Sequence, residues 1–192
     1  MAYDPQIVRT KFIPPLPRKR LLIRARLAEL LEGVVSHKVT VLQAGPGYGK
    51  STVLAVHLSR AGVPSFWYCV NGADTDPRVF IAHLIWCLRA VYPTMGSHSL
   101  ALLEENYSPY ARRQALDLLS SDLLDQVVGD IAIVIDDYHA VVKSPEVDEI
   151  VESLINTMPP QVHLVLSTRE RPSFGSLARW RVRGEALEIT EK

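Results

Sequence analysis

Apolar residues cluster in five short runs, and the longer segments between these runs show helical spacing. The runs cover residues 39–43, 65–70, 131–135, 162–166 and 186–190. The third run reads Ile-Ala-Ile-Val-Ile and is apolar at every position. A strand of this kind is typical of a central position in a parallel sheet, where helices cover both faces. We therefore predict five strands.

Helix signals lie between the predicted strands. Asp76-Pro77 and Ser144-Pro145 each combine an N-cap residue with a proline in the first turn. Apolar stripes at helical spacing run through Leu116, Leu119, Leu123 and Val127, and through Val147, Ile150, Val151, Leu154, Ile155 and Met158. Residues 92–110 show no clear period and are expected to form a loop with a short helical piece.

This alternation of strands and helices predicts an α/β fold with a five-stranded, mainly parallel sheet sandwiched by helices. Right-handed crossovers place the loops that follow the strands along one edge of the sheet, so we expect ligand chemistry at that edge. Residues 11–20 contain three prolines and predict an extended, non-helical arm. A short amphipathic helix is expected over 24–32. We therefore divide the chain into an arm, 1–23, and a domain, 24–192.

The first predicted strand runs into a glycine-rich segment, Ala-Gly-Pro-Gly-Tyr-Gly-Lys-Ser-Thr, at residues 44–52. A loop that wraps a phosphate must aim several backbone N–H groups inward, and glycine tolerates the φ values that this requires. The following helix directs its positive end at the same anion. This is the P-loop pattern with alanine at its first position, and the alternative is an ordinary glycine-rich turn. The predicted nucleotide contacts are Gly45, Gly47, Tyr48, Gly49, Lys50, Ser51 and Thr52.

Within this loop, two side chains have predicted roles of their own. Lys50 is expected to reach the β- and γ-phosphates, and the Ser51 hydroxyl is expected to ligate Mg²⁺. The third predicted strand runs directly into Asp136-Asp137. In a P-loop protein one acid at this place holds Mg²⁺, directly or through water, and a second can orient or deprotonate the attacking water. The alternative is a solvated strand end, because Asp is common in turns.

Arg169 follows the fourth predicted strand, which ends Leu-Ser-Thr-Arg. A polar group and an arginine at that strand end can reach the γ-phosphate, where arginine stabilises developing charge. The alternative is a surface arginine. The basic run Arg18-Lys19-Arg20 is most simply a solvated arm. The histidines show no zinc-ligand spacing.

Composition narrows the class of protein. The chain has 192 residues, of which 47% are hydrophobic and 22% charged, as in a globular domain. Its 21 basic and 21 acidic residues cancel, so we expect no direct nucleic-acid contact by this piece. No signal peptide or membrane-spanning run is visible, which predicts a cytoplasmic protein without membrane contact. Cys69 and Cys87 are expected to be buried free thiols, which suits a reducing compartment.

Several segments together resemble one family. They are 11–15 (Lys-Phe-Ile-Pro-Pro), 22–27 (Leu-Ile-Arg-Ala-Arg-Leu), the loop 44–52, 133–139 (Ile-Val-Ile-Asp-Asp-Tyr-His), 166–169 (Leu-Ser-Thr-Arg) and 181–184 (Arg-Val-Arg-Gly). In this order they resemble the ATPase module of the MalT-like, large ATP-binding LuxR-type transcriptional regulators. That family belongs to the STAND class of P-loop NTPases. The resemblance extends from about residue 10 to residue 189, and it departs from the family pattern at Val70-Asn71-Gly72.

The resemblance implies a nucleotide switch. Such modules bind ATP or ADP with Mg²⁺, hydrolyse ATP slowly, and self-associate only in the full-length, ATP-bound form. The resemblance assigns Mg²⁺ to Asp136, catalysis to Asp137 and γ-phosphate sensing to Arg169. It also places Arg24 near the adenine. In such proteins a helical lid, a winged helix, a sensor region and a DNA-binding domain follow, so the chain is expected to be an N-terminal fragment.

Two other functions compete with the switch. The first is a stand-alone P-loop kinase or other phosphoryl-transfer enzyme, which would need a substrate pocket and a lid within the chain. No arginine-rich lid segment is visible. The second is a pure interaction domain that has lost nucleotide binding, against which the intact Lys50, Ser51 and Asp136 argue. We therefore expect a weak ATPase that acts as a switch in signal transduction.

Overall fold

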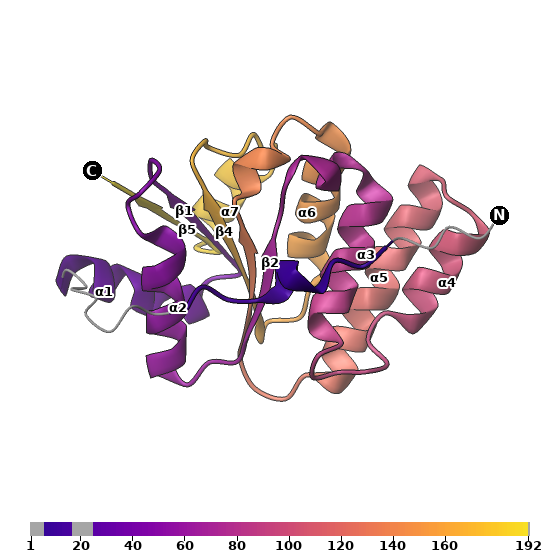
Figure 1. Cartoon of the computed structure of the whole chain (residues 1–192), viewed down its shortest axis with the longest axis horizontal. Coiled ribbons are helices and arrows are strands. Elements are labelled where there is room, and N and C mark those ends of the chain that lie inside the picture. Colours follow the sequence, from indigo (N-terminus) through magenta and orange to yellow (C-terminus); the bar gives the residue numbers. More distant parts are fainter. Residues whose placement is uncertain (1–5, 17–24, 192) are drawn as a thin grey trace.

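The computed structural model describes residues 6–16 and 25–191, and within them a parallel sheet lies between two layers of helices (Figure 1). The strands are β1 (Val39–Gln43), β2 (Ser65–Cys69), β3 (Ile131–Asp136), β4 (Val162–Thr168) and β5 (Ala186–Thr190). Their order is β2-β3-β4-β1-β5, and every pair of neighbours is parallel. This confirms the predicted α/β fold. β3 and β4 extend past their predicted ends and include Asp136 and Thr168.

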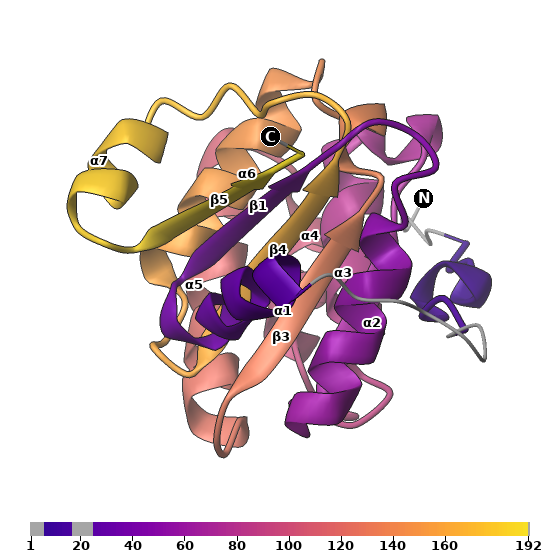
Figure 2. The same ribbon diagram turned by 90° about the vertical axis from the view of Figure 1, so that its left-hand side faces the viewer.

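Helices cover both faces of the sheet. They are α1 (Ala25–Glu32), α2 (Lys50–Ala61), α3 (Pro77–Leu88), α4 (Ser97–Glu105), α5 (Pro109–Gln126), α6 (Pro145–Thr157) and α7 (Leu177–Val182). Figures 1 and 2 show α1 and α2 on one face and α3 to α6 on the other. The predicted N-caps are present at both prolines, although only the Asp76 side chain accepts backbone N–H groups; Ser144 makes no such bond.

Two hydrophobic cores lie on the two faces of the sheet. We call the first the α2-side core; it includes Leu42, Leu54, Leu58, Trp67, Val134 and Val165. The second, the α3-side core, includes Val41, Tyr68, Ile85, Ile133, Ile135, Leu164 and Leu166. Because strand side chains alternate between faces, odd and even positions of one strand belong to different cores. This alternation decides which side chains at the strand ends face α2.

Two local expectations were wrong. Residues 92–110, expected to be mostly loop, include the nine-residue helix α4 and the start of α5. Helix α4 buries only Ser99 and Leu103, and the Ser99 hydroxyl donates to the Ala115 carbonyl oxygen at 2.8 Å. Two buried positions are too few to produce an apolar stripe. The arm is also not fully extended, because Arg9–Phe12 forms a 3-10 helix, η1.

The η1 segment docks against β2 through a buried ion pair. Lys11 Nζ lies 2.6 Å from both carboxylate oxygens of Asp74, and the Asp74 side chain is fully buried. The same carboxylate accepts the Tyr68 hydroxyl at 2.8 Å and the Asn71 backbone N–H at 2.7 Å. Phe12 packs edge-on against the Tyr68 ring. A charge this deeply buried requires its partner, so the cluster anchors the arm to the sheet.

His83 joins the arm to α3. The Val8 backbone N–H donates to His83 Nε2 at 3.2 Å, and His83 Nδ1 lies 2.9 Å from the Val79 carbonyl oxygen. Nε2 can accept only when the ring is neutral, with its proton on Nδ1. Burial lowers the pKa of His83, and Lys11 lowers it further, although the Val79 carbonyl and Asp74 oppose the shift. The neutral form of the His83 ring therefore helps to hold the arm against α3.

We expect the free energy of unfolding to decrease as the pH falls below about 6.5, the ordinary histidine pKa. Because the folded state lowers the pKa of His83, the unfolded state binds the proton more readily, and acid favours unfolding. Above that pH the contribution is constant. Urea denaturation at several pH values measures it. Burial also lowers the pKa of His57, so His83→Gln should reduce the slope without abolishing it. An unchanged slope in His83→Gln would contradict the His83 assignment.

Within residues 6–16 and 25–191, the structure contains no helix that is both long and apolar enough to span a membrane. The prediction for the cysteines is half right. Cys87 on α3 is buried, and burial raises the pKa of its thiol. Cys69, expected to be buried, is exposed at the last position of the edge strand β2. A strand end at the sheet edge is not covered by a helix, which hydropathy alone does not reveal.

Candidate functional site

The glycine-rich segment forms the connection between β1 and α2 at the carboxyl edge of the sheet. Gly47 and Gly49 have φ values of 80° and 74°, in the left-handed region that disfavours side chains. Gly49 is also the N-cap of α2 and supplies no side-chain cap. The first backbone N–H groups of a helix have no intrahelical acceptor. The loop therefore presents free N–H groups and the positive end of a 12-residue helix to an anion.

Lys50 closes the loop from the first turn of α2. Its Nζ donates to the carbonyl oxygens of Ala44 at 2.7 Å and Gly45 at 3.0 Å. On the other side of the loop, the Gly45 backbone N–H donates to the Glu191 carboxylate at 3.0 Å. Tyr48 is 67% exposed at the tip. The loop thus binds the Lys50 ammonium through two carbonyl oxygens and contacts the Glu191 carboxylate through one N–H group.

Four further charged groups lie close enough to Lys50 to act on its ammonium. Burial lowers the pKa of Lys50, and the nearby Arg169 guanidinium lowers it further. The carboxylates of Asp136, Asp137 and Glu191 oppose this shift. Lys50, Arg169 and the acid pair come from α2, the end of β4 and the end of β3. The fold thus brings together groups that are more than 80 residues apart in the sequence.

Asp136 is the last residue of β3 and is 7% exposed. Its Oδ1 accepts the Asp137 backbone N–H at 3.0 Å, and its carbonyl oxygen accepts the Val70 N–H at 3.0 Å. Within the described part of the chain, its Oδ2 makes no hydrogen bond. Since Val134 belongs to the α2-side core, strand alternation places Asp136 on the same face as α2. The carboxylate is therefore held firmly and keeps one oxygen available.

Asp137 has an unusual backbone conformation. Its φ of 57° and ψ of 34° are left-handed, and it is the sole non-glycine residue with positive φ among those that the structure describes. Its carboxylate is 45% exposed, and Oδ1 lies 3.8 Å from His139 Nδ1, too far for a hydrogen bond. The His139 Nδ1 atom is buried without a hydrogen-bond partner within the described ranges. Aspartate is one of the few non-glycine residues that adopt this conformation readily.

The end of β4 connects the acid pair with the loop. The Thr168 carbonyl oxygen accepts the Ala44 N–H at 3.2 Å, and the Thr168 hydroxyl donates to the Glu170 carbonyl oxygen at 2.7 Å. The Gln43 side-chain amide reaches the Arg169 carbonyl oxygen at 3.5 Å. The Arg169 side chain itself is exposed, and no residue within 6–16 and 25–191 fixes it by a hydrogen bond. It is thus free to reorient toward a ligand.

The donor set suits a magnesium ion. The Ser51 hydroxyl and the Asp136 carboxylate are hard oxygen ligands, the type that Mg²⁺ prefers. The buried Ser167 hydroxyl next to this place has no hydrogen-bond partner in the part of the chain that the structure describes. No group of three or more His, Cys, Asp or Glu side chains in the described residues could hold a metal. Mg²⁺ at a P-loop takes most of its ligands from phosphate and water, so one carboxylate suffices.

Nearly all of the predicted site residues therefore lie at one edge of the sheet. The loop residues, the acid pair and Arg169 are among them. Arg24 and the run 18–20 lie outside the described residues. Glu191 was not predicted, because its contact with Gly45 joins residues 146 positions apart. The unpartnered state of the Ser167 hydroxyl was also invisible in the sequence.

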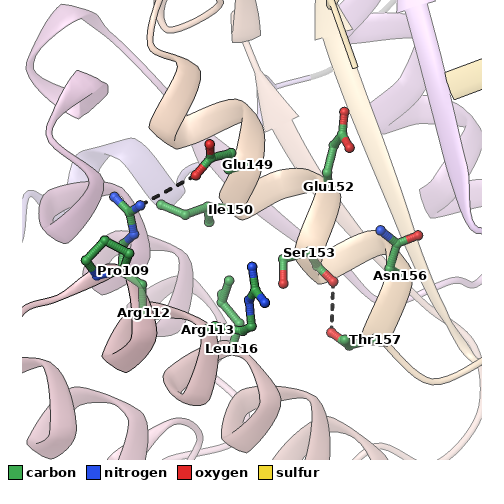
Figure 3. Close-up of a pocket in the computed structure, with 10 residues that line it drawn as sticks. All are labelled: Pro109, Arg112, Arg113, Leu116, Glu149, Ile150, Glu152, Ser153, Asn156 and Thr157. Atoms are coloured by element: carbon green, nitrogen blue, oxygen red, sulfur yellow. Dashed lines mark hydrogen bonds and ion pairs between the residues drawn. The ribbon is translucent and has the colours of Figure 1, made fainter. Parts of the chain in front are cut away.

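A separate groove of about 390 Å³ lies between α5 and α6 (Figure 3). Arg112 and Arg113 line it from α5, and Glu149, Glu152 and Ser153 line it from α6. Arg112 is already paired with Glu146 at 2.6 Å and Glu149 at 3.6 Å. None of the predicted site residues lines the groove, so the two features are distinct.

The sequence is similar to parts of two larger kinds of protein, although no family model matches it. It is 27% identical over 183 residues to the HTH-type transcriptional regulator MalT of Yersinia enterocolitica, covering 95% of this chain and 20% of MalT. It is 32% identical over 135 residues to the serine/threonine-protein kinase PknK of Mycobacterium tuberculosis, covering 69% of this chain and 12% of PknK. The chain thus spans about a fifth of the MalT regulators that it matches.

Solved structures give weaker likenesses. A Drosophila ORC structure bound to DNA has a TM-score of 0.47 at 13% identity and covers 84% of this chain and 86% of that chain. The Aeropyrum pernix ORC1 protein in complex with DNA has a TM-score of 0.45 at 17% identity and covers 87% and 43%. These likenesses add nothing to what the strand order and the loop already show.

MalT regulators of several organisms match nearly the whole chain. A Vibrio cholerae MalT, for example, is 26% identical over 172 residues, covering 88% of this chain and 18% of that protein. The fold provides the parallel sheet and the loop-to-helix junction that a P-loop requires. The chain is therefore similar in sequence, over most of its length, to the MalT-type transcriptional regulators, and it has the α/β fold of a P-loop NTPase.

Proposed function

We propose that this chain is the nucleotide-switch domain of a signal-responsive transcriptional regulator, and that it binds ATP or ADP with Mg²⁺ and hydrolyses ATP slowly. Residues 24–192 form the nucleotide-binding domain and 1–23 the arm. The output is a change of assembly: self-association occurs in the full-length, ATP-bound protein. The observation that carries the proposal is the convergence of Lys50, Asp136, Asp137 and Arg169 at the N-terminus of α2.

The binding part of the proposal rests on the loop. A phosphate chain would replace the acceptors that Lys50 now uses, which are the Ala44 and Gly45 carbonyl oxygens. It would also compete with the Glu191 carboxylate for the Gly45 N–H. The N–H groups from Gly47 to Thr52, for which the described part of the chain offers no acceptor, and the helix dipole favour the anion. Lys50 then supplies charge to the β- and γ-phosphates.

The hydrolytic part of the proposal assigns one task to each polar group. Ser51 and Asp136 hold the magnesium ion, and Asp137 orients the attacking water. Arg169, whose side chain is exposed, contacts the γ-phosphate. When bound, Mg²⁺ neutralises charge on the phosphate oxygens. The partial exposure of Asp137 leaves its carboxylate accessible to water, as this task requires.

Calorimetric titration of the protein with ATP and with ADP, each with Mg²⁺, tests the binding step. We expect both nucleotides to bind at one site per chain. If neither ATP nor ADP binds, the proposed function is wrong. Transfer of labelled phosphate to an added metabolite, instead of to water, would support the competing phosphoryl-transfer enzyme.

We expect Asp137→Asn to retain ATP affinity and to lose hydrolysis by about 100-fold or more, the usual contribution of a positioned general base. Asparagine keeps the shape of the side chain and tolerates the left-handed conformation observed here, so the loop geometry is preserved. Single-turnover hydrolysis of labelled ATP, with protein in excess, measures the rate.

Asp130→Asn is the matched control for this prediction. Asp130 immediately precedes the same strand at its opposite end, and its side chain is 60% exposed. The control should hydrolyse ATP at the wild-type rate. If Asp137→Asn also hydrolyses ATP at that rate, Asp137 has no catalytic role. If it loses affinity together with turnover, it acts in binding instead.

A further inference from the structure

Glu191 directly follows β5 and contacts the glycine-rich loop. β5 and β1 are parallel, and Figure 2 shows both strands ending at the same edge of the sheet. Thr190 pairs with Gln43, so the next residues, Glu191 and Ala44, leave the two strands at the same level. The Glu191 carboxylate accepts the Gly45 backbone N–H at 3.0 Å. The end of the last strand thus places a negative charge against the loop that is predicted to bind phosphate.

One peptide group of the loop is bonded to a charged side chain on each side. This group is the peptide between Ala44 and Gly45. Its carbonyl oxygen accepts Lys50 Nζ at 2.7 Å, and its N–H donates to Glu191 at 3.0 Å. A chain of a cation, a peptide and an anion is strengthened by mutual polarisation. In the free protein Glu191 therefore supplies a negative charge that pairs with Lys50 across the loop.

The Glu191 carboxylate can leave the loop easily. Glu191 is exposed, and among residues 6–16 and 25–191 its side chain is held by one hydrogen bond, the bond to Gly45. A carboxylate that leaves such a bond is solvated by water, whereas the fully buried Asp74 carboxylate has no such access. Glu191 is therefore a group that an incoming phosphate can displace.

A phosphate chain at the loop would meet the Glu191 carboxylate as a like charge. Burial lowers the pKa of Lys50, and Arg169 lowers it further. Glu191 is among the carboxylates that raise the pKa of Lys50, so it is close enough to act on the ammonium. Phosphates that approach Lys50 therefore also approach Glu191 and are repelled by it. The proposed Mg²⁺ offsets the charge of the acid pair, whereas the proposed site supplies no further cation for Glu191.

We propose that Glu191 is an autoinhibitory residue: its carboxylate holds the Gly45 N–H of the free loop and must leave it when the phosphates of ATP or ADP bind. The inference rests on the proposed function and adds a regulatory contact to it. The contact stabilises the free protein and opposes the nucleotide-bound one. Its removal should therefore change the stability of the free protein and the affinity for nucleotide in opposite directions.

Two substitutions of Glu191 test the inference. Glu191→Gln removes the charge and keeps the shape of the side chain and an acceptor for the Gly45 N–H. Calorimetric titration with ATP and with ADP, each with Mg²⁺, should give about tenfold higher affinity than in the wild type, because one like charge near the phosphates is gone. Glu191→Ala also removes the acceptor. It should bind nucleotide at least as tightly as Glu191→Gln.

Thermal unfolding of the free protein is the second measurement. Glu191→Ala should melt about 2 °C below the wild type without nucleotide, because the free loop loses a hydrogen bond to a charged acceptor. Lower stability of the free protein together with higher affinity for nucleotide is the expected signature of an autoinhibitory contact. A residue with a merely structural role in the loop would lower both stability and affinity.

Glu185→Gln is the matched control for the charge. Glu185 immediately precedes β5, at the end of the strand away from the loop, and lies 3.6 Å from Lys38. Its replacement removes the same charge from the same side of the sheet edge. The control should bind ATP and ADP like the wild type. An equal gain of affinity in Glu185→Gln would assign the effect to net charge and overturn the inference.

The outcomes separate the inference from the proposed function. If the wild type binds nucleotide and Glu191→Gln binds it with the same or lower affinity, the inference fails and the proposed function stands. If neither protein binds nucleotide, the proposed function is wrong and the inference falls with it. An unchanged melting temperature of Glu191→Ala would show that the carboxylate does not hold the free loop, which would also overturn the inference.

Discussion

Replacing Lys50 with alanine is expected to weaken ATP binding by about 100-fold or more. Two charge-assisted hydrogen bonds to phosphate oxygens contribute about 3 kcal/mol or more together, and each 1.4 kcal/mol is a factor of ten in affinity. Without nucleotide the Lys50 ammonium is held by two carbonyl oxygens of the loop, and Arg169, Asp136 and Asp137 lie close enough to act on its charge. Alanine removes the cation that the phosphates would approach.

The measurement is calorimetric titration with ATP and Mg²⁺, accompanied by thermal unfolding of the free protein. The unfolding measurement is needed to detect any loss of stability, because Lys50→Ala also deletes the two hydrogen bonds to the loop. Lys38→Ala is the control. Lys38 directly precedes β1, at the end of the strand away from the loop, and its replacement removes the same charge. The control should bind ATP like the wild type. Wild-type affinity in Lys50→Ala would show that the loop is not a phosphate site.

Replacing Lys11 with methionine is expected to lower the free energy of unfolding by about 3–5 kcal/mol, the range for breaking one side of a buried ion pair. Lys11 is 9% exposed and Asp74 is fully buried, so the change leaves a carboxylate without its cation in the interior. Methionine retains much of the length and packing of the lysine stem, which isolates the effect of the charge. Urea denaturation measures the loss.

Lys38→Met is the matched control for the ion pair. Lys38 lies 3.6 Å from Glu185, and both side chains are partly exposed, so the pair contributes about 1 kcal/mol or less. The double variant Lys11→Met/Asp74→Asn should recover part of the loss, because both buried charges are then absent. The recovery is partial because the Tyr68 hydroxyl and the Asn71 backbone N–H, which both donate to Asp74, still need an acceptor at this place. A loss below about 1 kcal/mol in Lys11→Met would mean that η1 is not docked in solution.

The sheet could be predicted from the sequence because its strands are apolar and its turns are marked by glycine and proline. The bounds of β1 and β5 were predicted correctly. β3 and β4 continue into polar residues, Asp136 and Thr168, because the backbone ladder extends past the last apolar position. Hydropathy cannot detect this continuation, since a polar strand end and a loop have the same composition.

Most residues of the candidate site could be predicted from the sequence, although Glu191 and the contacts between the residues could not. A local pattern identifies the loop and the acid pair, because glycine spacing and adjacent acids are visible along the chain. The Lys11–Asp74 pair and the Glu191–Gly45 contact join residues 63 and 146 positions apart. Nothing in the sequence links such partners. The left-handed conformation of Asp137 is likewise set by the packing of the turn after β3.

The strand order also determines when the site can form during synthesis. β4 lies between β1 and β3, although it is made after both of them. A nascent chain that has emerged only as far as Asp137 therefore contains the loop and the acids but lacks the strand that joins their two halves. Nucleotide cannot stabilise such an intermediate through both groups. If nucleotide binds as proposed, it can contact the loop and the acids together only after Val162–Thr168 has been inserted. It would then stabilise chains with a complete sheet and not partly made ones.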